Sequence, residues 1–437
     1  MKFKAVSFTT LLIIFCISFS KAQEVLTLEE AIKIALENNY DIKLYKNNLQ
    51  INKNDATLAN AGVFPYVTGT FGDNATVTNT KQTQSTGQVV DRNGAKNTNL
   101  NYGANLNWTV FDGFGMFATY NRLKELRNLG EANLKSTVLA TLTNVINSYY
   151  ALAGLQQTLK SVQSALELSQ LRYNIALNRY KIGRAAKLEV LNASVDLNTD
   201  TTNLLRQVEQ IKNIKVQLNQ IIARNAVTDF KVIDTIMVNT GLSYEPLQEQ
   251  AEKLNPDLQA ALVNQRIAEY SLKEVKADRY PVIGLNTGYN YQKNTSELGF
   301  ARSSQGQGFT YGVTASINIF NGFLQHKNER NAAILIDNAK LEYNKLNESI
   351  KAQLTTAYQT YLTNIELVKL EEHNQQIAQQ NLDITVTKFR LGSITPLEFR
   401  EAQRNYVDAR VRFTNAQYQA KLAEVSLKQI SGTLELD

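Results

Sequence analysis

Cysteine and histidine are almost missing from this chain. Its single cysteine is Cys16, and its two histidines, His326 and His373, lie in polar surroundings. Structural disulfides, cysteine-based zinc sites and thiol nucleophiles are excluded once the N-terminal segment is removed. No Ser/His/Asp, metal-ligand or phosphate-binding constellation is present either. The sequence therefore predicts neither an enzyme nor a cofactor.

Proline and long apolar runs are also scarce. Five prolines among 437 residues favour long, uninterrupted elements. After the N-terminus no apolar run reaches the roughly 18 residues that suggest a membrane-spanning helix, which excludes a polytopic helical membrane protein. With 43% hydrophobic and 20% charged residues the chain can still fold. Because it has no block of lysine and arginine, nucleic acid is not expected as a partner.

An export signal is predicted over residues 1–22. Lys2 and Lys4 precede the apolar run Leu11–Phe19, and Ser20-Lys-Ala22 places small residues before a cut at Gln23. This is the three-part layout of a secretory signal peptide, and its apolar run is too short for a stable anchor. Three lysines leave with it, so half of the formal net charge of +6 belongs to the signal. An exported chain without cysteine fits a bacterial envelope.

The remaining sequence is a tandem repeat. Phe64-Pro65 recurs as Tyr280-Pro281 at a shift of 216 residues. Phe111-Asp-Gly-Phe114 recurs as Phe320-Asn-Gly-Phe323, and Tyr180-Lys-Ile-Gly183 as Phe389-Arg-Leu-Gly392, both at a shift of 209. Because the order is preserved, we interpret the chain as two structural repeats, 23–225 and 226–437.

Each repeat reads as helix, strand, strand, long helix and helix. Thr27 and Glu30 have capping-box spacing and start a first short helix. The first repeat then predicts a helix over about 39–64, strands 66–78 and 100–111, a long helix 114–182 and a helix 185–223. The second predicts helix 256–280, strands 282–292 and 309–320, long helix 322–391 and helix 394–431. Polar segments, 79–98 and 293–308, join the strands, and two short helices are expected to stack end to end beside each long one.

The strands alternate apolar and small polar residues. A half-buried sheet on a protein core is one interpretation. A membrane barrel is favoured because the strands have bilayer-spanning length, aromatic ends and a small, uncharged second face. Leu106, Trp108, Tyr311 and Ile317 are then predicted to face lipid. Since four strands cannot close and open edges cannot face lipid, several chains must share one barrel, and three chains would supply twelve strands.

These features together resemble the TolC family of outer-membrane efflux and secretion channels. The resemblance rests on the opening Leu26–Asn39, Phe64-Pro65, Phe111-Asp-Gly113, Ile182-Gly183 with Leu188-Glu189, and their second-repeat counterparts. It implies a mixed fold of α and transmembrane β structure: a homotrimer whose shared twelve-stranded β-barrel continues into a long α-helical periplasmic barrel with an equatorial belt.

The resemblance also implies a function. It predicts an exit duct in the outer membrane for efflux or type I secretion, working with a periplasmic adaptor (membrane fusion) protein and an inner-membrane pump of RND, ABC or MFS type. A trimeric envelope spacer or adhesin without transport is the alternative. Conductance across a bilayer, or drug hypersensitivity on deletion, would separate the two.

The turns after the long helices are the predicted closable end. Gly183 and Gly392 have the place of C′ glycines, and with Leu188 and Leu397 they form the predicted adaptor-docking tip. Glu189, Glu398 and Glu401 follow, and in the family pattern acidic residues at the latter two places ring the periplasmic entrance; acids at a helix start also simply complement its dipole. The family's basic tip-locking residue and a tyrosine correspond to Ile394 and Phe389 here, which argues against that lock.

Overall fold

The chain forms two compact units in a computed structural model that describes residues 25–298 and 301–434. The helical unit comprises the chain up to Lys46, Asn133–Gln259 and the chain from Lys345 onward; the strand-bearing unit comprises Asn47–Ala132 and Ala260–Asn344. Each unit takes residues from both halves of the sequence, so the compact units differ from the repeats 23–225 and 226–437. The predicted signal peptide, 1–22, lies outside the described residues.

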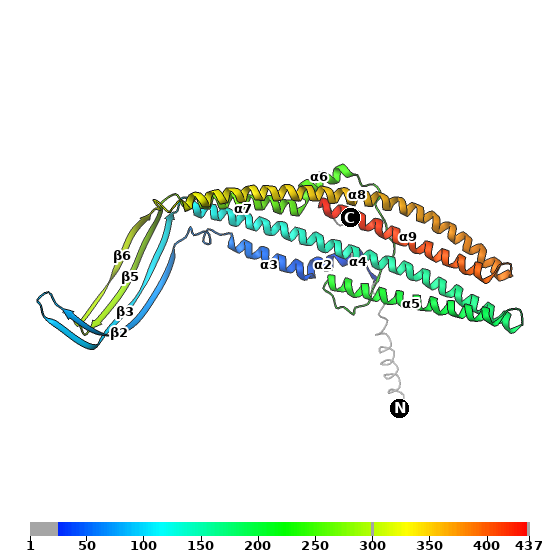
Figure 1. Cartoon of the computed structure of the whole chain (residues 1–437), viewed down its shortest axis with the longest axis horizontal. Helices are drawn as coiled ribbons and strands as arrows, with labels where there is room; N and C mark the ends of the chain where they lie inside the picture. The colour runs from blue at the N-terminus through cyan, green and yellow to red at the C-terminus, as the bar shows by residue number, and fades with distance from the viewer. Residues whose placement is uncertain (1–24, 299–300, 435–437) are drawn as a thin grey trace, which may run out of the picture. The chain divides into compact units, whose positions relative to one another are not determined.

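Four antiparallel strands form the sheet of the strand-bearing unit, and Figure 1 shows them side by side. They are β2 (Tyr66–Thr83), β3 (Val89–Phe111), β5 (Val282–Ser296) and β6 (Ser303–Ser316), in the spatial order β2-β3-β5-β6. Within the described chain, β2 and β6 therefore each have one edge without a neighbouring strand.

The strand bounds differ from the sequence expectation. β2 and β3 extend far into the segment 79–98, and β5 and β6 into 293–308, which were predicted as connections. Their threonines suit a strand, and backbone pairing needs no apolar side chain. At its other end β6 stops at Ser316 and not at 320, shortly before Gly322 and Phe323, which have φ values of 66° and 63°.

Helices α4 (Gly115–Lys181), α7 (Pro256–Ala277) and α8 (Leu324–Leu391) have residues in both units. Ion pairs of 2.8 Å between Arg122 and Glu274 and of 2.9 Å between Arg266 and Glu125 join α4 to α7 in the strand-bearing unit. The strand-to-helix turn needs Gly113, whose φ is 74°, because a Cβ there would lie 2.8 Å from the Cβ of Tyr280.

α3 (Tyr40–Asp55) is shorter than the helix predicted over 39–64. Its last turn, Asn52-Lys-Asn-Asp55, consists mostly of poor helix formers whose side chains compete for backbone groups. Asn60 then donates to the carbonyl of Asp55, and Gly62 turns the chain with a φ of 84°. The helix therefore ends ten residues before Pro65 and not at it.

The helical unit is built around the middle of α4. It adds α2 (Leu28–Asn38), α5 (Lys187–Ile221), α6 (Tyr244–Leu254), α9 (Pro396–Ser431) and the short parallel pair β1 (Val25–Leu26) with β4 (Lys231–Val232). The capping box predicted at Thr27 and Glu30 is confirmed. The hydroxyl of buried Tyr149 accepts from the amide of Ile233 and donates to the carbonyl of Leu26, and burial raises its pKa.

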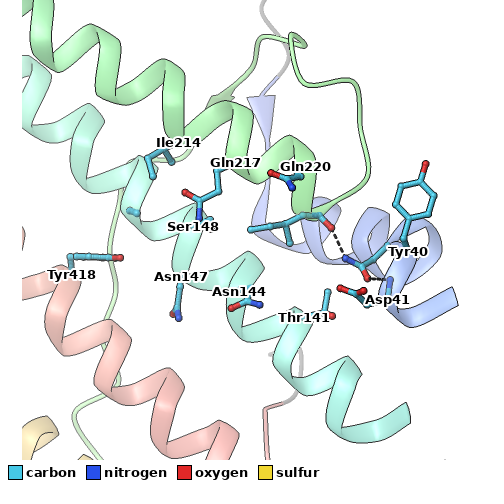
Figure 2. Close-up of a pocket in the computed structure, with 13 residues that line it drawn as sticks. Tyr40, Asp41, Thr141, Asn144, Asn147, Ser148, Ile214, Gln217, Gln220 and Tyr418 are labelled. Atoms are coloured by element: carbon cyan, nitrogen blue, oxygen red, sulfur yellow. Dashed lines mark hydrogen bonds between the residues drawn. The ribbon is translucent and has the colours of Figure 1, made fainter. Parts of the chain in front are cut away.

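Two asparagines join helices end to end in this unit. Oδ1 of Asn39 accepts hydrogen bonds from the backbone amides of Asp41 and Ile42 at the start of α3. Its Nδ2 donates a hydrogen bond to the carbonyl of Ile221 at the end of α5, at 2.8 Å (Figure 2). Asn255 repeats this arrangement between α7 and the carbonyl of Ile430 in α9, at 2.9 Å. Each asparagine thus satisfies orphan groups at the end of one helix and the start of another.

The remaining helix bounds lie close to expectation. α4, α5, α8 and α9 begin and end within two residues of the predicted bounds, and α7 ends three residues before 280, ahead of Pro281. Among the described helices, none is long and apolar enough to cross a membrane.

Candidate functional site: an exposed apolar sheet face and a helical tip

One face of the sheet is apolar and exposed. The pairing register aligns rows of side chains across the four strands, such as Val67, Leu106, Thr287 and Tyr311. The next two rows on one side contain aromatic pairs: Tyr289 meets Phe309 at 4.9 Å, and in the row beyond it Tyr102 stacks on Tyr291 at 4.8 Å. Tyr311 is 87% exposed. A soluble sheet would cover such a surface, and a membrane-facing sheet leaves it for lipid.

The predicted lipid-facing residues fall into two groups. Leu106, Trp108 and Tyr311 occupy strand positions on this apolar face. Ile317 lies one residue past the end of β6, so its predicted place within a strand 309–320 is wrong. The indole N–H of Trp108 donates to the carbonyl of Val63 at 2.9 Å, which satisfies its polar atom while the ring stays partly exposed.

Both helical turns at the tip have the same backbone geometry. Gly183 and Gly392 have φ values of 72° and 76°. The amides of Gly183 and Arg184 donate to the carbonyls of Tyr180 and Arg179, and Gly392 and Ser393 do the same with Phe389 and Lys388. These bonds are the two of a Schellman motif, which ends a helix at a left-handed C′ glycine.

A groove of about 490 Å³ lies between the starts of α5 and α9 and the end of α4. Leu188, Glu189 and Leu397 line it together with Ala186, Ala193, Pro396 and other residues. Leu188 and Leu397 are strongly exposed, so the groove has an apolar rim, and its charged lining residues are Glu189, Asp196, Arg172 and Arg400. The structure therefore brings together Leu188 and Leu397 of the predicted docking tip and Glu189 of the predicted entrance, while Gly183, Gly392, Glu398 and Glu401 do not line this groove.

Glu398 has a structural partner that the sequence interpretation overlooked. Thr395 and Glu398 form a capping box: the Glu398 carboxylate accepts from the amide of Thr395 at 2.7 Å and from its hydroxyl at 2.9 Å. These hydrogen bonds to Thr395, the backbone bond first, lower the pKa of Glu398. Glu398 stays solvent-exposed, and Glu401 is exposed on the same first turns of α9.

An ion-pair cluster in the lining of the groove was also missed. Asp196 of α5 pairs with the buried Arg172 of α4 and, at 2.9 Å, with Arg400 of α9. One turn further along α5, Asp200 accepts from Ser169 of α4, whose hydroxyl lies 3.0 Å from the amide nitrogen of Gln403 of α9. We call Arg172, Asp196 and Arg400 the tip triad. No local pattern marks these residues, because their partners come from three distant helices.

Phe389 takes part in a second contact at the tip. It is fully buried and stacks on Phe399 of α9, with ring centroids 4.5 Å apart, and the guanidinium of Arg179 lies 5.6 Å from its centroid. Phe389 of α8 therefore connects α4 and α9 through its ring.

We call the hydrogen bonds by which Asn39 connects α3 to Ile221 of α5 the joint at Asn39. A polar hollow of about 630 Å³ opens beside it, between α3, α4, α5 and α9 (Figure 2). Amides and hydroxyls line most of it, including Asn144, Gln217 and Ser148, with Asp41 as the charged member. Within residues 25–298 and 301–434, no group of three or more His, Cys, Asp or Glu side chains is placed to hold a metal ion.

Comparison with solved structures identifies this arrangement. The Campylobacter jejuni CmeC outer membrane channel matches with a TM-score of 0.76 at 17% identity, covering 93% of this chain and 85% of that one. CusC, described as forming a transmembrane channel, matches with a TM-score of 0.75 at 15% identity, covering 95% of each chain. The fold is therefore that of an outer-membrane channel, with a helical part and a β domain.

Sequence comparison gives the family. The profile of the outer membrane efflux protein family matches residues 31–224 and 247–433. TolC of Vibrio cholerae is 22% identical over 317 residues, 70% of each chain, and the toluene efflux pump outer membrane protein TtgC of Pseudomonas putida is 23% identical over 439 aligned positions, 93% of this chain and 82% of that one. The chain belongs to the outer membrane efflux protein family. It is a protein of the outer membrane that extends into the periplasm.

Proposed function

We propose that three copies of this chain form one exit duct in the outer membrane, which exports cargo by efflux or type I secretion. A periplasmic adaptor and an inner-membrane pump of RND, ABC or MFS type would complete the route. The duct itself is passive and needs no enzymatic activity or cofactor. The proposal includes the duplicated organisation, with the repeats 23–225 and 226–437 each giving two strands to the shared barrel.

The observation that carries the proposal is the sheet with an exposed apolar face and two open edges. An open edge in lipid leaves backbone groups unsatisfied, so only a closed barrel is stable there. β2 and β6 are the outer strands of the described sheet, and pairing β6 of one copy with β2 of the next closes the ring. The names of relatives, such as the toluene efflux pump protein TtgC, support export as the purpose.

Conductance tests this function. Purified protein in a planar bilayer should give discrete conductance steps, and a deletion strain should become hypersensitive to drugs or lose a secreted product. A trimeric spacer or adhesin is the competing function, and it predicts assembly in the membrane without conductance and without a transport phenotype.

The tip groove is the proposed docking site for the adaptor, around Gly183, Leu188, Gly392 and Leu397. Exposed leucines beside a groove suit the end of a helical hairpin, which docks by its apolar side chains. Leu188→Cys and Leu397→Cys should each crosslink to cysteines on the adaptor's hairpin. Removal of the predicted signal peptide removes the only natural cysteine, Cys16, so each variant carries its introduced cysteine alone.

The matched control for crosslinking is Glu249→Cys on α6, an equally accessible position away from the tip. Crosslinking at Glu249→Cys and not at the two tip positions would place the adaptor beside α6 and overturn this docking site.

The acidic residues Glu189, Glu398 and Glu401 are proposed to ring the periplasmic entrance. Acidic rings favour cations, so Glu398→Gln with Glu401→Gln should lower the permeability of cations relative to anions, more at low salt than at high salt. Glutamine also serves in a capping box, so the change removes charge and keeps the start of α9. Reversal potentials in a salt gradient measure the effect.

Glu366→Gln on α8 is the control for the entrance ring, since it removes an exposed carboxylate elsewhere on the helical unit. Identical reversal potentials for wild type and the double variant would leave Glu398 and Glu401 as ordinary helix-start acids.

A further inference from the structure

The two strand hairpins of the sheet have the same pairing register. Tyr66 pairs with Asn107 in the hairpin of β2 and β3, and Val282 pairs with Ser316 in the hairpin of β5 and β6. Tyr66 and Val282 are 216 residues apart, and Asn107 and Ser316 are 209 apart. These are the two shifts that relate the sequence motifs of the repeats, so the repeats agree in strand pairing as well as in sequence.

The repeats meet where β3 pairs with β5, and we call this pairing the seam between the repeats. Asn105 lies opposite Gly288 there, and Asn290 lies opposite Gly103. A Cβ on either glycine would overlap the Oδ1 atom of the facing asparagine, so each glycine makes room for an amide. The two asparagines also exchange hydrogen bonds of 3.0 and 3.3 Å. Side-chain packing therefore fixes the register of the seam, in addition to the backbone pairing.

The turn that follows β3 is part of the same seam. Gly113 is buried in it against Ala277 and Tyr280 of the second repeat. Its counterpart Gly322 has a similar backbone, with φ values of 74° and 66° for the two glycines. Gly322 is exposed, and a Cβ there would meet no described atom within 4 Å. Phe64, the counterpart of Tyr280, is 57% exposed. Gly322 and Phe64 thus correspond to two seam residues, and both are exposed in the isolated chain.

We propose that the edge strands of neighbouring copies reproduce this seam, so that β6 of one copy pairs with β2 of the next in the register of β3 with β5. The seam pair of Asn101 and Gln292 then corresponds to Thr310 with Thr76 of the next copy. The occupant of each open edge is a second copy of this chain. The inference rests on the proposed duct, and it adds which residues meet where the barrel closes.

The side chains favour this register over its alternatives. It places Gly312 opposite Asn74 of the next copy, which reproduces the facing of Gly103 and Asn290 at the seam. A shift of two residues either way separates Gly312 from Asn74, and in one direction it places Gly312 opposite Gly72. A shift of one residue would put the apolar face of one copy beside the opposite, polar face of the next, because side chains alternate along a strand.

The same correspondence brings Phe64 of the next copy to Gly322, as Tyr280 lies at Gly113. Gly322→Ala should therefore weaken the oligomer, because its Cβ would lie where the phenylalanine approaches. Gly87→Ala is the matched control: Gly87 also has a positive φ, 83°, and a Cβ there also meets nothing within 4 Å, so the backbone strain is comparable. The measurement is the temperature at which the detergent-resistant oligomer dissociates, which should fall for Gly322→Ala alone. Equal temperatures for the two variants would overturn the contact at Gly322.

Disulfide crosslinking between copies tests the register. Thr76→Cys with Thr310→Cys pairs two thiols on the polar face, and Ala75→Cys with Tyr311→Cys pairs two on the apolar face. Opposite residues are closer on one face of an antiparallel pair than on the other, so at least one of the two pairs suits a disulfide. β2 and β6 are opposite edges of the sheet, so the bond cannot form within one copy. With a mild oxidant, the assembled protein should give covalent dimers and trimers on a denaturing gel.

Asn74→Cys with Thr310→Cys and Thr78→Cys with Thr310→Cys are the controls for the register, since each moves one thiol by two residues along the same face. Diagonal neighbours lie about 7–8 Å apart, farther than the roughly 3.5–4.5 Å between the Cβ atoms of a disulfide. These controls should therefore lose most of the covalent product. A control that gives more product than both matched pairs would overturn the register and leave the duct standing.

The remaining outcomes separate this inference from the proposed function. A conducting protein in which neither matched pair crosslinks overturns the repeated seam alone. A protein whose matched pairs crosslink but which does not conduct supports the seam and overturns the duct. A protein that neither forms an oligomer nor conducts overturns both.

Discussion

Replacing Tyr311 by arginine is expected to abolish assembly of the protein in the outer membrane, whereas the same replacement at Thr310 should leave assembly intact. Tyr311 is 87% exposed in the isolated chain, so arginine there breaks little within the chain itself. The cost comes from lipid, roughly 2–4 kcal/mol for an arginine near the bilayer midplane, and a trimer carries it three times. Thr310 is the neighbouring residue on the polar face, where arginine meets water.

The measurement is the fraction of protein that reaches the outer membrane as a detergent-resistant oligomer. Tyr311 is a cleaner position than Trp108, since Trp108→Arg also removes the hydrogen bond to the carbonyl of Val63. Equal assembly of Tyr311→Arg and wild type would contradict a lipid-facing surface. Equal failure of Tyr311→Arg and Thr310→Arg would show that the strand merely rejects a large side chain.

Asp196→Asn is expected to loosen the helical tip. The side chain of Arg172 is only 4% exposed, and its main charge partner is Asp196. Removing one member of a buried pair leaves the other charge uncompensated and typically costs 3–5 kcal/mol. Amide hydrogen exchange in residues 165–200 and 396–410 should therefore accelerate by about a hundredfold or more, because about 1.4 kcal/mol corresponds to tenfold.

Asp408→Asn provides the matched control for the tip triad. Asp408 pairs with Arg404 at 3.9 Å on the surface, and both side chains are more than half exposed. Such a pair contributes about 0–1 kcal/mol, so exchange should barely change. The double variant Arg172→Met with Asp196→Leu should recover much of the lost protection, since it removes both charges. Unchanged exchange in Asp196→Asn would show that the triad does not hold the tip together.

Sequence patterns predicted the helices well and the strand ends poorly. Helical periodicity, the Thr27 capping box and the C′ glycines Gly183 and Gly392 all act locally, within one turn of the chain. The outer parts of β2 and β3 carry threonine, asparagine and glutamine without apolar alternation. They pair through the backbone, and the sequence alone makes them indistinguishable from a polar connection.

Contacts between distant helices could not be predicted from the sequence. The recurrence of Asn39-Tyr-Asp41 as Asn255-Pro-Asp257 marks a repeated position, yet nothing in it names Ile221 or Ile430 as partners. Arg172, Asp196 and Arg400 lie on three helices and share no spacing. Glu398 is the instructive intermediate case. Its three-residue distance from Thr395 was readable as a capping box, but it was interpreted only as an entrance carboxylate or as an acid that complements the helix dipole.

The joint at Asn39 fixes an order of events during folding. The hydrogen bond from Asn39 to Ile221 spans 182 residues, and the bond from Asn255 to Ile430 spans 175. The start of α3 thus comes early in the chain, but its joint can form only once the whole of α4 and α5 is present. Contacts of such sequence separation carry a large loop-closure entropy and form late. The first helices made are therefore among the last to be finished, and a chain interrupted before residue 221 leaves the joint at Asn39 without its second helix.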